Sequence, residues 1–115
     1  MELIESTILK NLIHNEEYSR KSIPFLKAEY FEDRKEKVIF EEILSFIVKY
    51  DTSITIEALN IEVDNRTDLT EDEVKGIKEI ITSLKESSVD QQWLLDSTEK
   101  WCRDRAIYLL SLIHI

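Results

Sequence analysis

Apolar residues recur every three or four positions along most of the chain, and short polar runs separate the periodic stretches. This spacing is typical of amphipathic helices that bury one face. It predicts six helices, over about 2–14, 16–22, 33–50, 55–63, 70–85 and from 90 onwards. The chain has one glycine and one proline, whereas sheets with tight hairpins use more of both. The sequence therefore predicts an all-α protein, a compact bundle of about six helices in one domain.

Capping residues mark several of the predicted boundaries. Thr70 and Glu73 occupy the two positions of a capping box, in which each side chain reaches the other residue's backbone amide. Thr55 and Asp90 are expected to cap the helices that follow them. Pro24 lacks a backbone donor and disfavours helix in the residue before it, so the second helix should stop ahead of it.

Two groups of apolar residues are assigned to the core. An aromatic-rich connection contains Phe25, Leu26, Tyr30 and Phe31, which we interpret as core side chains. In the helix over 33–50, residues such as Val48 widen the apolar stripe, so this helix is expected to be central. Gly76 interrupts the helix over 70–85 and indicates a close contact with another helix.

The chain is acidic, with 24 acidic and 15 basic residues and a net charge of −9. Binding to nucleic-acid phosphates draws on clustered Lys and Arg, and no long basic run is present. We therefore expect no direct DNA binding by this chain. The acidity indicates a solvated surface or an attraction for a basic partner, and we favour the former. Adjacent acids such as Glu41 and Glu42 should be solvated charges on different helix faces.

Nothing in the sequence indicates export or membrane insertion. No apolar run approaches the ~18 residues of a membrane helix, and no basic-then-apolar signal begins the chain. A single cysteine, Cys102, fits a reducing compartment. These features predict an intracellular, cytoplasmic protein.

The motifs of common catalytic and cofactor sites are missing. A phosphate-binding loop or a dinucleotide fingerprint needs several glycines, and Gly76 stands alone. A zinc site of paired Cys and His is excluded by one cysteine and two histidines. A Cys102–His14 nucleophilic pair is conceivable, but a lone helical cysteine is more often a packing residue. We therefore assign no catalytic, cofactor-binding or metal-binding residue.

The last predicted helix carries the candidate interface residues Trp93, Leu94, Trp101 and Tyr108. Leu94, Trp101 and Tyr108 stand seven residues apart and so share one helix face. Core packing is the default interpretation of such residues. Protein–protein contact is the alternative, because Trp and Tyr are enriched at interface hot spots.

The final residues, Leu110–Ile115, can be encoded by CTG-TCT-CTT-ATA-CAC-ATC. This sequence resembles the mosaic end of a transposon used to build sequencing libraries. We therefore predict a native domain over 1–109 and a non-native tail over 110–115, with the natural protein continuing past about Leu109. The alternative is a genuine apolar helix end.

Several short motifs, in this order and spacing, resemble the N-terminal domain of the DnaB family of hexameric replicative DNA helicases, especially its tailed-phage branch. The resemblance extends from roughly Leu3 to Leu109. Its motifs are an apolar first helix ending in an Asn-containing turn, an aromatic segment, an Ile-Phe-x-x-Ile run, the start of a short helix, and a last helix with an Arg-x-x-Ala-like ending. They lie at 8–13, 29–31, 38–43, 53–59 and 93–106.

The resemblance implies an all-helical collar domain that pairs with its neighbours in a ring and contacts primase or the helicase loader. In that family a linker joins the collar to a RecA-like motor that binds ATP and Mg and unwinds DNA. The parent protein is thus expected to be an ATP-dependent helicase in a phage-infected bacterial cell. No motor is present here, so this chain should not hydrolyse ATP or unwind DNA.

Two other functions stay open at this point. One is a stand-alone helical adaptor or regulatory protein whose ending is genuine. The other is a small cysteine enzyme, which predicts activity lost on Cys102→Ala.

Overall fold

The computed structural model describes residues 3–113, and all its regular elements are helical in that range. Six α-helices and two short 3₁₀ turns follow one another along the chain. They are α1 (Ile4–His14), α2 (Glu16–Ser22), η1 (Ile23–Phe25), η2 (Ala28–Tyr30), α3 (Arg34–Tyr50), α4 (Ile56–Asp64), α5 (Glu71–Ser83) and α6 (Gln91–Ile113). The predicted all-α bundle of about six helices is confirmed.

The predicted caps form as their sequence positions indicate. The Glu73 amide donates to Thr70 Oγ1 at 3.2 Å and the Thr70 amide donates to Glu73 Oε1 at 3.1 Å, which completes the capping box. The Ala58 amide donates to Thr55 Oγ1, and the Trp93 amide donates to Asp90 Oδ2. Local chemistry therefore fixes where α4, α5 and α6 begin.

Helix α3 ends at a residue with a left-handed backbone conformation. Asp51 follows the helix in the left-handed region, with φ 53° and ψ 37°, and its amide donates to the Ile47 carbonyl. Glycine is the usual residue at such a position, and Asp tolerates it better than most others. The polar break over 51–53 thus ends the helix without a glycine.

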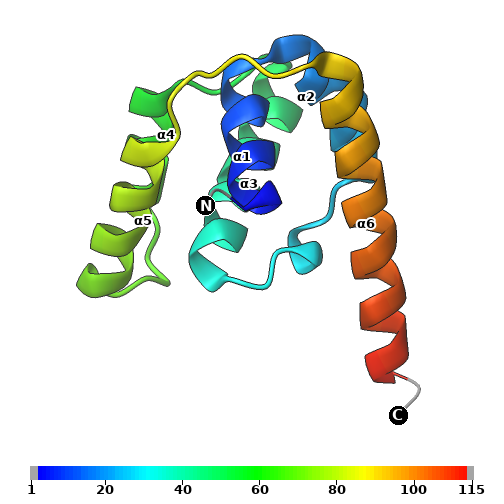
Figure 1. The fold of residues 1–115 in the computed structure, drawn as a ribbon. Coiled ribbons are helices and arrows are strands. Elements are labelled where there is room, and N and C mark those ends of the chain that lie inside the picture. Colours follow the sequence, from blue (N-terminus) through cyan, green and yellow to red (C-terminus); the bar gives the residue numbers. More distant parts are fainter. Residues whose placement is uncertain (1–2, 114–115) are drawn as a thin grey trace.

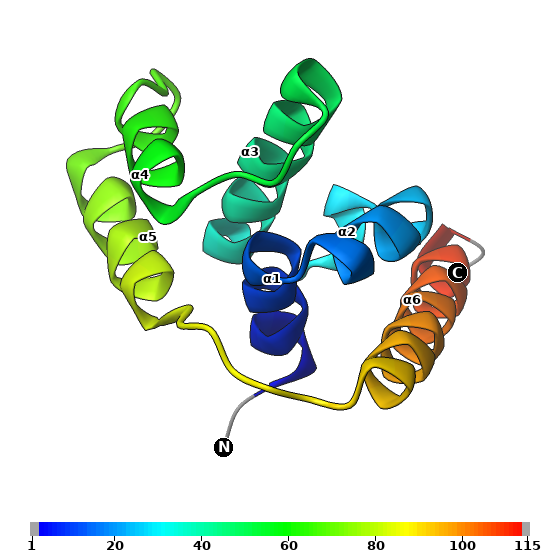
Figure 2. The same cartoon turned by 90° about the horizontal axis from the view of Figure 1, so that it is seen from above.

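Helices α1 and α3 pack together in the middle of the molecule, and the remaining helices cover them from two sides (Figure 1). On one side α4 and α5 pack against each other and against α3. On the other side α6 packs against α1, α2 and η2. Figure 2 shows the same division from above, with α5 and α6 on opposite sides of α1. The central position predicted for α3 is confirmed, and α1 shares it.

The core is mostly aliphatic and aromatic, with one buried polar link between distant helices. The Tyr18 hydroxyl lies 2.7 Å from Thr98 Oγ1, and Thr98 Oγ1 donates in turn to the Leu94 carbonyl at 2.8 Å. Because the Thr98 hydroxyl already donates its one hydrogen to the Leu94 carbonyl, Tyr18 must be the donor in the first bond. This chain of bonds fastens α6 to α2.

Two packing expectations are wrong. Phe25 was assigned to the core but is 64% exposed, because η1 turns it outward while Leu26, Tyr30 and Phe31 are buried. Val48 is 77% exposed, because the buried stripe of α3 ends at Ile43. Both side chains continue the apolar periodicity of the sequence, but no neighbouring element covers them in the fold.

The prediction that Pro24 ends the second helix and disfavours helix in the residue before it is correct only in its first part. Helix α2 does end at Ser22, but Ile23 keeps helical dihedrals (φ −50°, ψ −42°) and opens η1. Pro24 lies in the first turn of η1, where its missing donor has no intrahelical partner to lose. The proline therefore continues the chain in a tighter turn instead of an extended segment.

Gly76 does mark a close approach between helices. A Cβ atom at this position would lie 2.9 Å from Lys35 Cε, so the glycine leaves room for the Lys35 side chain where α5 meets α3. The contact is with a flexible side chain and not with a backbone.

Glu41 and Glu42 are not independent solvated charges as predicted. Arg66 Nη1 lies 3.3 Å from a carboxylate oxygen of each, and Arg66 Nη2 lies 2.7 Å from Asp68 Oδ2. A long guanidinium from beyond α4 can bridge two adjacent helix positions, which their own spacing does not reveal. The cluster ties the end of α4 to α3.

Candidate functional site

Helix α6 buries one narrow stripe, and most of the rest of its surface is exposed. The buried residues Leu94, Thr98 and Cys102 follow one another at a spacing of four. Beyond Cys102 the helix buries no further residue as far as Ile113. In Figure 1 this second half of α6 extends away from the other helices.

Leu94, one of the four candidate interface residues, belongs to the core and has no exposed surface. It faces inward because it heads the buried stripe of α6, so it cannot touch a partner in this conformation. The spacing of seven that linked it to Trp101 and Tyr108 drifts around a straight helix by about 20° per seven residues. The shared face therefore rotates from the core toward solvent along α6.

Trp101 is partly buried between α6 and the segment that precedes α3. Its ring lies 5.0 Å from the Phe31 ring and meets the Tyr30 ring edge-on at 6.1 Å. These are ordinary aromatic packing geometries. Trp101 thus acts mainly as a packing residue whose outer edge reaches the surface.

Tyr108 is the exposed aromatic residue at this end of the helix, with 49% of its surface accessible. The Arg105 guanidinium lies 5.0 Å from the centre of the Tyr108 ring, and Arg105 Nε donates to the Tyr30 carbonyl at 2.7 Å. The hydrogen bond holds Arg105 in place, and the cation–π contact orients the tyrosine. Trp101, Arg105 and Tyr108 therefore form one continuous patch, here called the Tyr108 patch.

Trp93 is 52% exposed but lies at the other end of α6. Fifteen residues separate it from Tyr108, which is about 22 Å along a helix axis. The structure thus brings Trp101 and Tyr108 together and leaves Trp93 apart, so the predicted set does not form a single surface.

The end of α6 carries apolar side chains that sequence analysis had assigned in part to a non-native tail. The exposed residues in this stretch are Ile107, Tyr108, Leu110, Leu112 and Ile113. Their helical order reflects the helix propensity of the sequence and does not test the origin of residues 110–115. His114 and Ile115 lie outside the described residues.

An acidic pocket of about 350 Å³ adjoins the Tyr108 patch where α1, α3 and α6 meet. Carboxylates from three segments line it, and Trp101 and Arg105 form its other wall. Burial, with smaller contributions from Asp33 and Glu5, raises the pKa of Glu36 to about 7. Glu36 is consequently only partly ionised at neutral pH.

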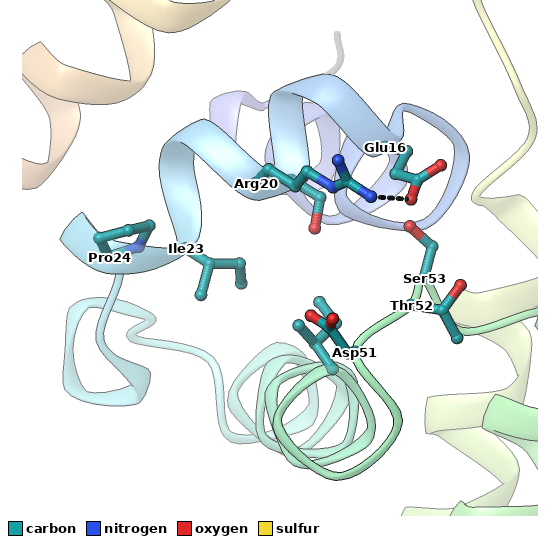
Figure 3. Close-up of a pocket in the computed structure, with 9 residues that line it drawn as sticks. Glu16, Arg20, Ile23, Pro24, Asp51, Thr52 and Ser53 are labelled. Carbon is teal, nitrogen blue, oxygen red and sulfur yellow. Dashed lines mark hydrogen bonds and ion pairs between the residues drawn. The ribbon is translucent and has the colours of Figure 1, made fainter.

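A second hollow of about 210 Å³ lies between α2, η1 and the end of α3, and sequence analysis did not single it out. Figure 3 shows Ile23 and Pro24 on one wall and the turn at Asp51 on the other, with the Arg20–Glu16 ion pair (2.9 Å) at the rim. Its surface is mainly apolar, and it holds no arrangement of nucleophile, base and acid.

Cys102 and His14 are not assembled as a nucleophilic pair. Burial raises the pKa of the Cys102 thiol to about 11, so the thiol stays protonated at neutral pH and is a poor nucleophile. His14 Nε2 is instead 2.8 Å from the Leu84 carbonyl. Neither residue has the geometry that the cysteine-enzyme hypothesis requires.

Among residues 3–113, no group of three or more His, Cys, Asp or Glu side chains is placed to hold a metal ion. None of the helices there is both long and apolar enough to cross a bilayer.

Comparison with known proteins bears on the resemblance seen in the sequence. The chain is 37% identical over 101 residues to a DnaB-like replicative helicase of Enterobacteria phage T4. The chain is a relative of that DnaB-like helicase. The aligned region covers 88% of this chain but only 21% of the helicase, so this chain spans about a fifth of the relative's length. No protein-family model matches the chain. The resemblance to replicative helicases is thereby confirmed.

Proposed function

We propose that this chain is the N-terminal assembly and partner-binding domain of a replicative DNA helicase. The observation that carries the proposal is the 37% identity, over 88% of this chain, to a protein named as a DnaB-like replicative helicase. The all-helical fold and the exposed end of α6 are in keeping with a domain that works through protein contacts.

The proposal assigns catalysis to a part of the parent protein outside this chain. ATP-dependent DNA unwinding, with ATP and Mg, belongs to a motor domain, for which a phosphate-binding loop is needed. Such a loop requires two glycines, and Gly76 is the only glycine here. The parent would act at a replication fork in the cytoplasm of a phage-infected bacterial cell.

The partners we propose are neighbouring copies of the helicase, as dimer contacts within a hexamer, and primase or a helicase loader. Tyr108 and Trp93 supply exposed aromatic surface of the kind that anchors interfaces. The net charge of −9 is unsuited to phosphate contacts, so these contacts would be with protein and not with DNA.

The direct test is binding of the purified 115-residue chain to the primase and the loader encoded with it, by calorimetry, together with sedimentation over a range of concentrations. We expect binding to at least one protein, weakened at least tenfold by Tyr108→Ala. Ile61→Ala is the matched control, because Ile61 is 58% exposed on α4, away from α6. A chain that remains monomeric and binds neither protein would contradict the proposal.

A second test separates this function from that of a stand-alone adaptor. Reading the coding DNA past Ile115 from an overlapping clone should reveal a linker and then a G-x-x-x-x-G-K loop. An ordinary stop codon, preceded by codons unlike the transposon end, would favour the adaptor.

A further inference from the structure

Two neighbouring residues at the junction of α1 and α2, His14 and Asn15, hold the two ends of the segment between α5 and α6. It runs past the C-terminal end of α1, joining the two sides of the molecule (Figures 1 and 2). His14 Nε2 is 2.8 Å from the Leu84 carbonyl, and Asn15 Nδ2 donates to Gln91 Oε1 at 2.9 Å. We refer to residues 84–90 as the strap.

The anchor at the α5 end of the strap is fully satisfied. A carbonyl only accepts, so His14 Nε2 must carry the hydrogen in this bond. Leu84 is itself 2% exposed and packs into the core. This end therefore has both a polar and an apolar attachment.

The anchor at the α6 end leaves a buried donor without a partner. Asn15 Oδ1 accepts from the Tyr18 amide at 3.1 Å, which fixes Asn15 Nδ2 as the group that faces Gln91. Gln91 then uses its oxygen, and its Nε2 is buried with no hydrogen-bond partner among residues 3–113. A buried donor in this state carries an uncompensated desolvation penalty. Exposing Gln91 to water would remove that penalty.

Between its anchors the strap has one partly buried apolar residue, Val89, which packs against the core. Lys85, Glu86, Ser87, Ser88 and Asp90 are all exposed. From Glu86 to Asp90 no backbone amide donates to another residue of the described range. Asp90 nevertheless matters to α6, because its carboxylate accepts from the Trp93 amide at 2.8 Å and its carbonyl accepts from the Leu94 amide at 3.0 Å.

We propose that the strap opens at its α6 end, with the His14–Leu84 anchor as the pivot. Opening hydrates the Gln91 amide and takes Asp90 away from the first turn of α6. The core contacts of Leu94 and Thr98 keep the remainder of α6 in place. The exposed Trp93 lies in the turn that is released, so strap opening changes how this aromatic residue is presented. The proposal stands independently of the helicase assignment.

Residue-resolved amide hydrogen exchange of the full chain tests this. Helix α5 provides an internal reference, because Glu73 and Val74 occupy the same two capped positions that Trp93 and Leu94 occupy in α6. Leu94 is buried and Val74 only partly so, which by burial alone predicts slower exchange in α6. We expect the reverse, with Trp93 and Leu94 exchanging at least tenfold faster than Glu73 and Val74. Equal or slower exchange in α6 overturns the proposal.

Substitutions at the two anchor residues locate the pivot. Asn15→Ser retains a side-chain oxygen to cap α2 but cannot reach Gln91, so it should accelerate Trp93 and Leu94 a further several-fold and leave Leu84 unchanged. His14→Phe removes the other anchor and should accelerate Leu84 and Lys85, whereas His14→Gln, which keeps a donor, should not. Acceleration spread equally over α1 and α3 in Asn15→Ser would mean a general loss of stability and would contradict a local opening.

Discussion

Helices α1 and α6 differ in how much of their surface is buried. Helix α1 has 11 residues and buries seven in succession, Thr7 to Ile13, including Lys10 and Asn11. Helix α6 has 23 residues and buries three. The difference lies in position, because α2, α3 and α6 pack around α1, whereas α6 meets the rest of the molecule along one edge. Burial therefore depends on how much of a helix's circumference its neighbours surround and not on its length.

The largest expected effect is in α1. Leu9→Ala removes a side chain with no exposed surface and should lower the free energy of unfolding by about 3 kcal/mol, through lost transfer energy and a residual cavity. Urea unfolding followed by circular dichroism measures the change. A cost under 1 kcal/mol would mean that the core around α1 is loosely packed, and the contrast with α6 would fail.

The attachment of α6 to α2 should contribute less. Tyr18→Phe deletes the hydroxyl that donates to Thr98 and should cost about 1 kcal/mol, since Thr98 keeps its bond to the Leu94 carbonyl. Tyr50→Phe is the control, because Tyr50 is 54% exposed and should be nearly neutral. Equal costs for the two variants in the same urea titration would show that the buried bond adds nothing.

Where α1, α3 and α6 meet, stability should depend on pH through Glu36. Its pKa rises to about 7 in the folded chain, from an ordinary value of 4.5. The folded state therefore favours the protonated acid. The stability that this preference contributes is fully present below about pH 4.5 and is lost as the pH rises through 7. Glu36→Gln should stabilise the chain at pH 8 relative to wild type by roughly 1 kcal/mol, a figure reduced for solvent screening.

The measurement is the same urea titration at pH 5 and pH 8. The advantage of Glu36→Gln should shrink at pH 5, where the wild-type carboxyl is already protonated when folded. A constant difference at both pH values would show that Glu36 is solvated like an ordinary surface acid.

The smallest effect should be at the free end of α6. Ile107 is 59% exposed, so Ile107→Ala should change the free energy of unfolding by less than 0.5 kcal/mol. A loss comparable to that of Leu9→Ala would indicate that this end is covered in solution, for instance by a second copy. Sedimentation at the same concentration would distinguish that case.

Local signals in the sequence were good guides to helix boundaries. The capping box at Thr70 and the caps at Thr55 and Asp90 form as predicted, because such bonds involve residues three apart. Which apolar residues are covered was harder to predict. Phe25 and Val48 follow the apolar period but face solvent, because coverage depends on helices distant in sequence.

The candidate site shows the same limit. The exposure of Trp93 and Tyr108 agrees with an interface role, but Leu94 lies in the core, and the seven-residue spacing could not reveal which side of α6 meets α2. The strap contacts of His14 and Asn15 join residues 70 and 76 positions apart. No short-range pattern carries such information, because the partners of both residues lie far away in the sequence.

The bond between Tyr18 and Thr98 has a consequence for biosynthesis, since the two residues are 80 positions apart. At a synthesis rate of about 5–20 residues each second, roughly 4–16 s pass between the appearance of one partner and that of the other. During that interval the sides of α1 and α2 that receive α6 remain uncovered. The nascent chain thus presents an apolar surface to chaperones until translation of the last helix is nearly complete.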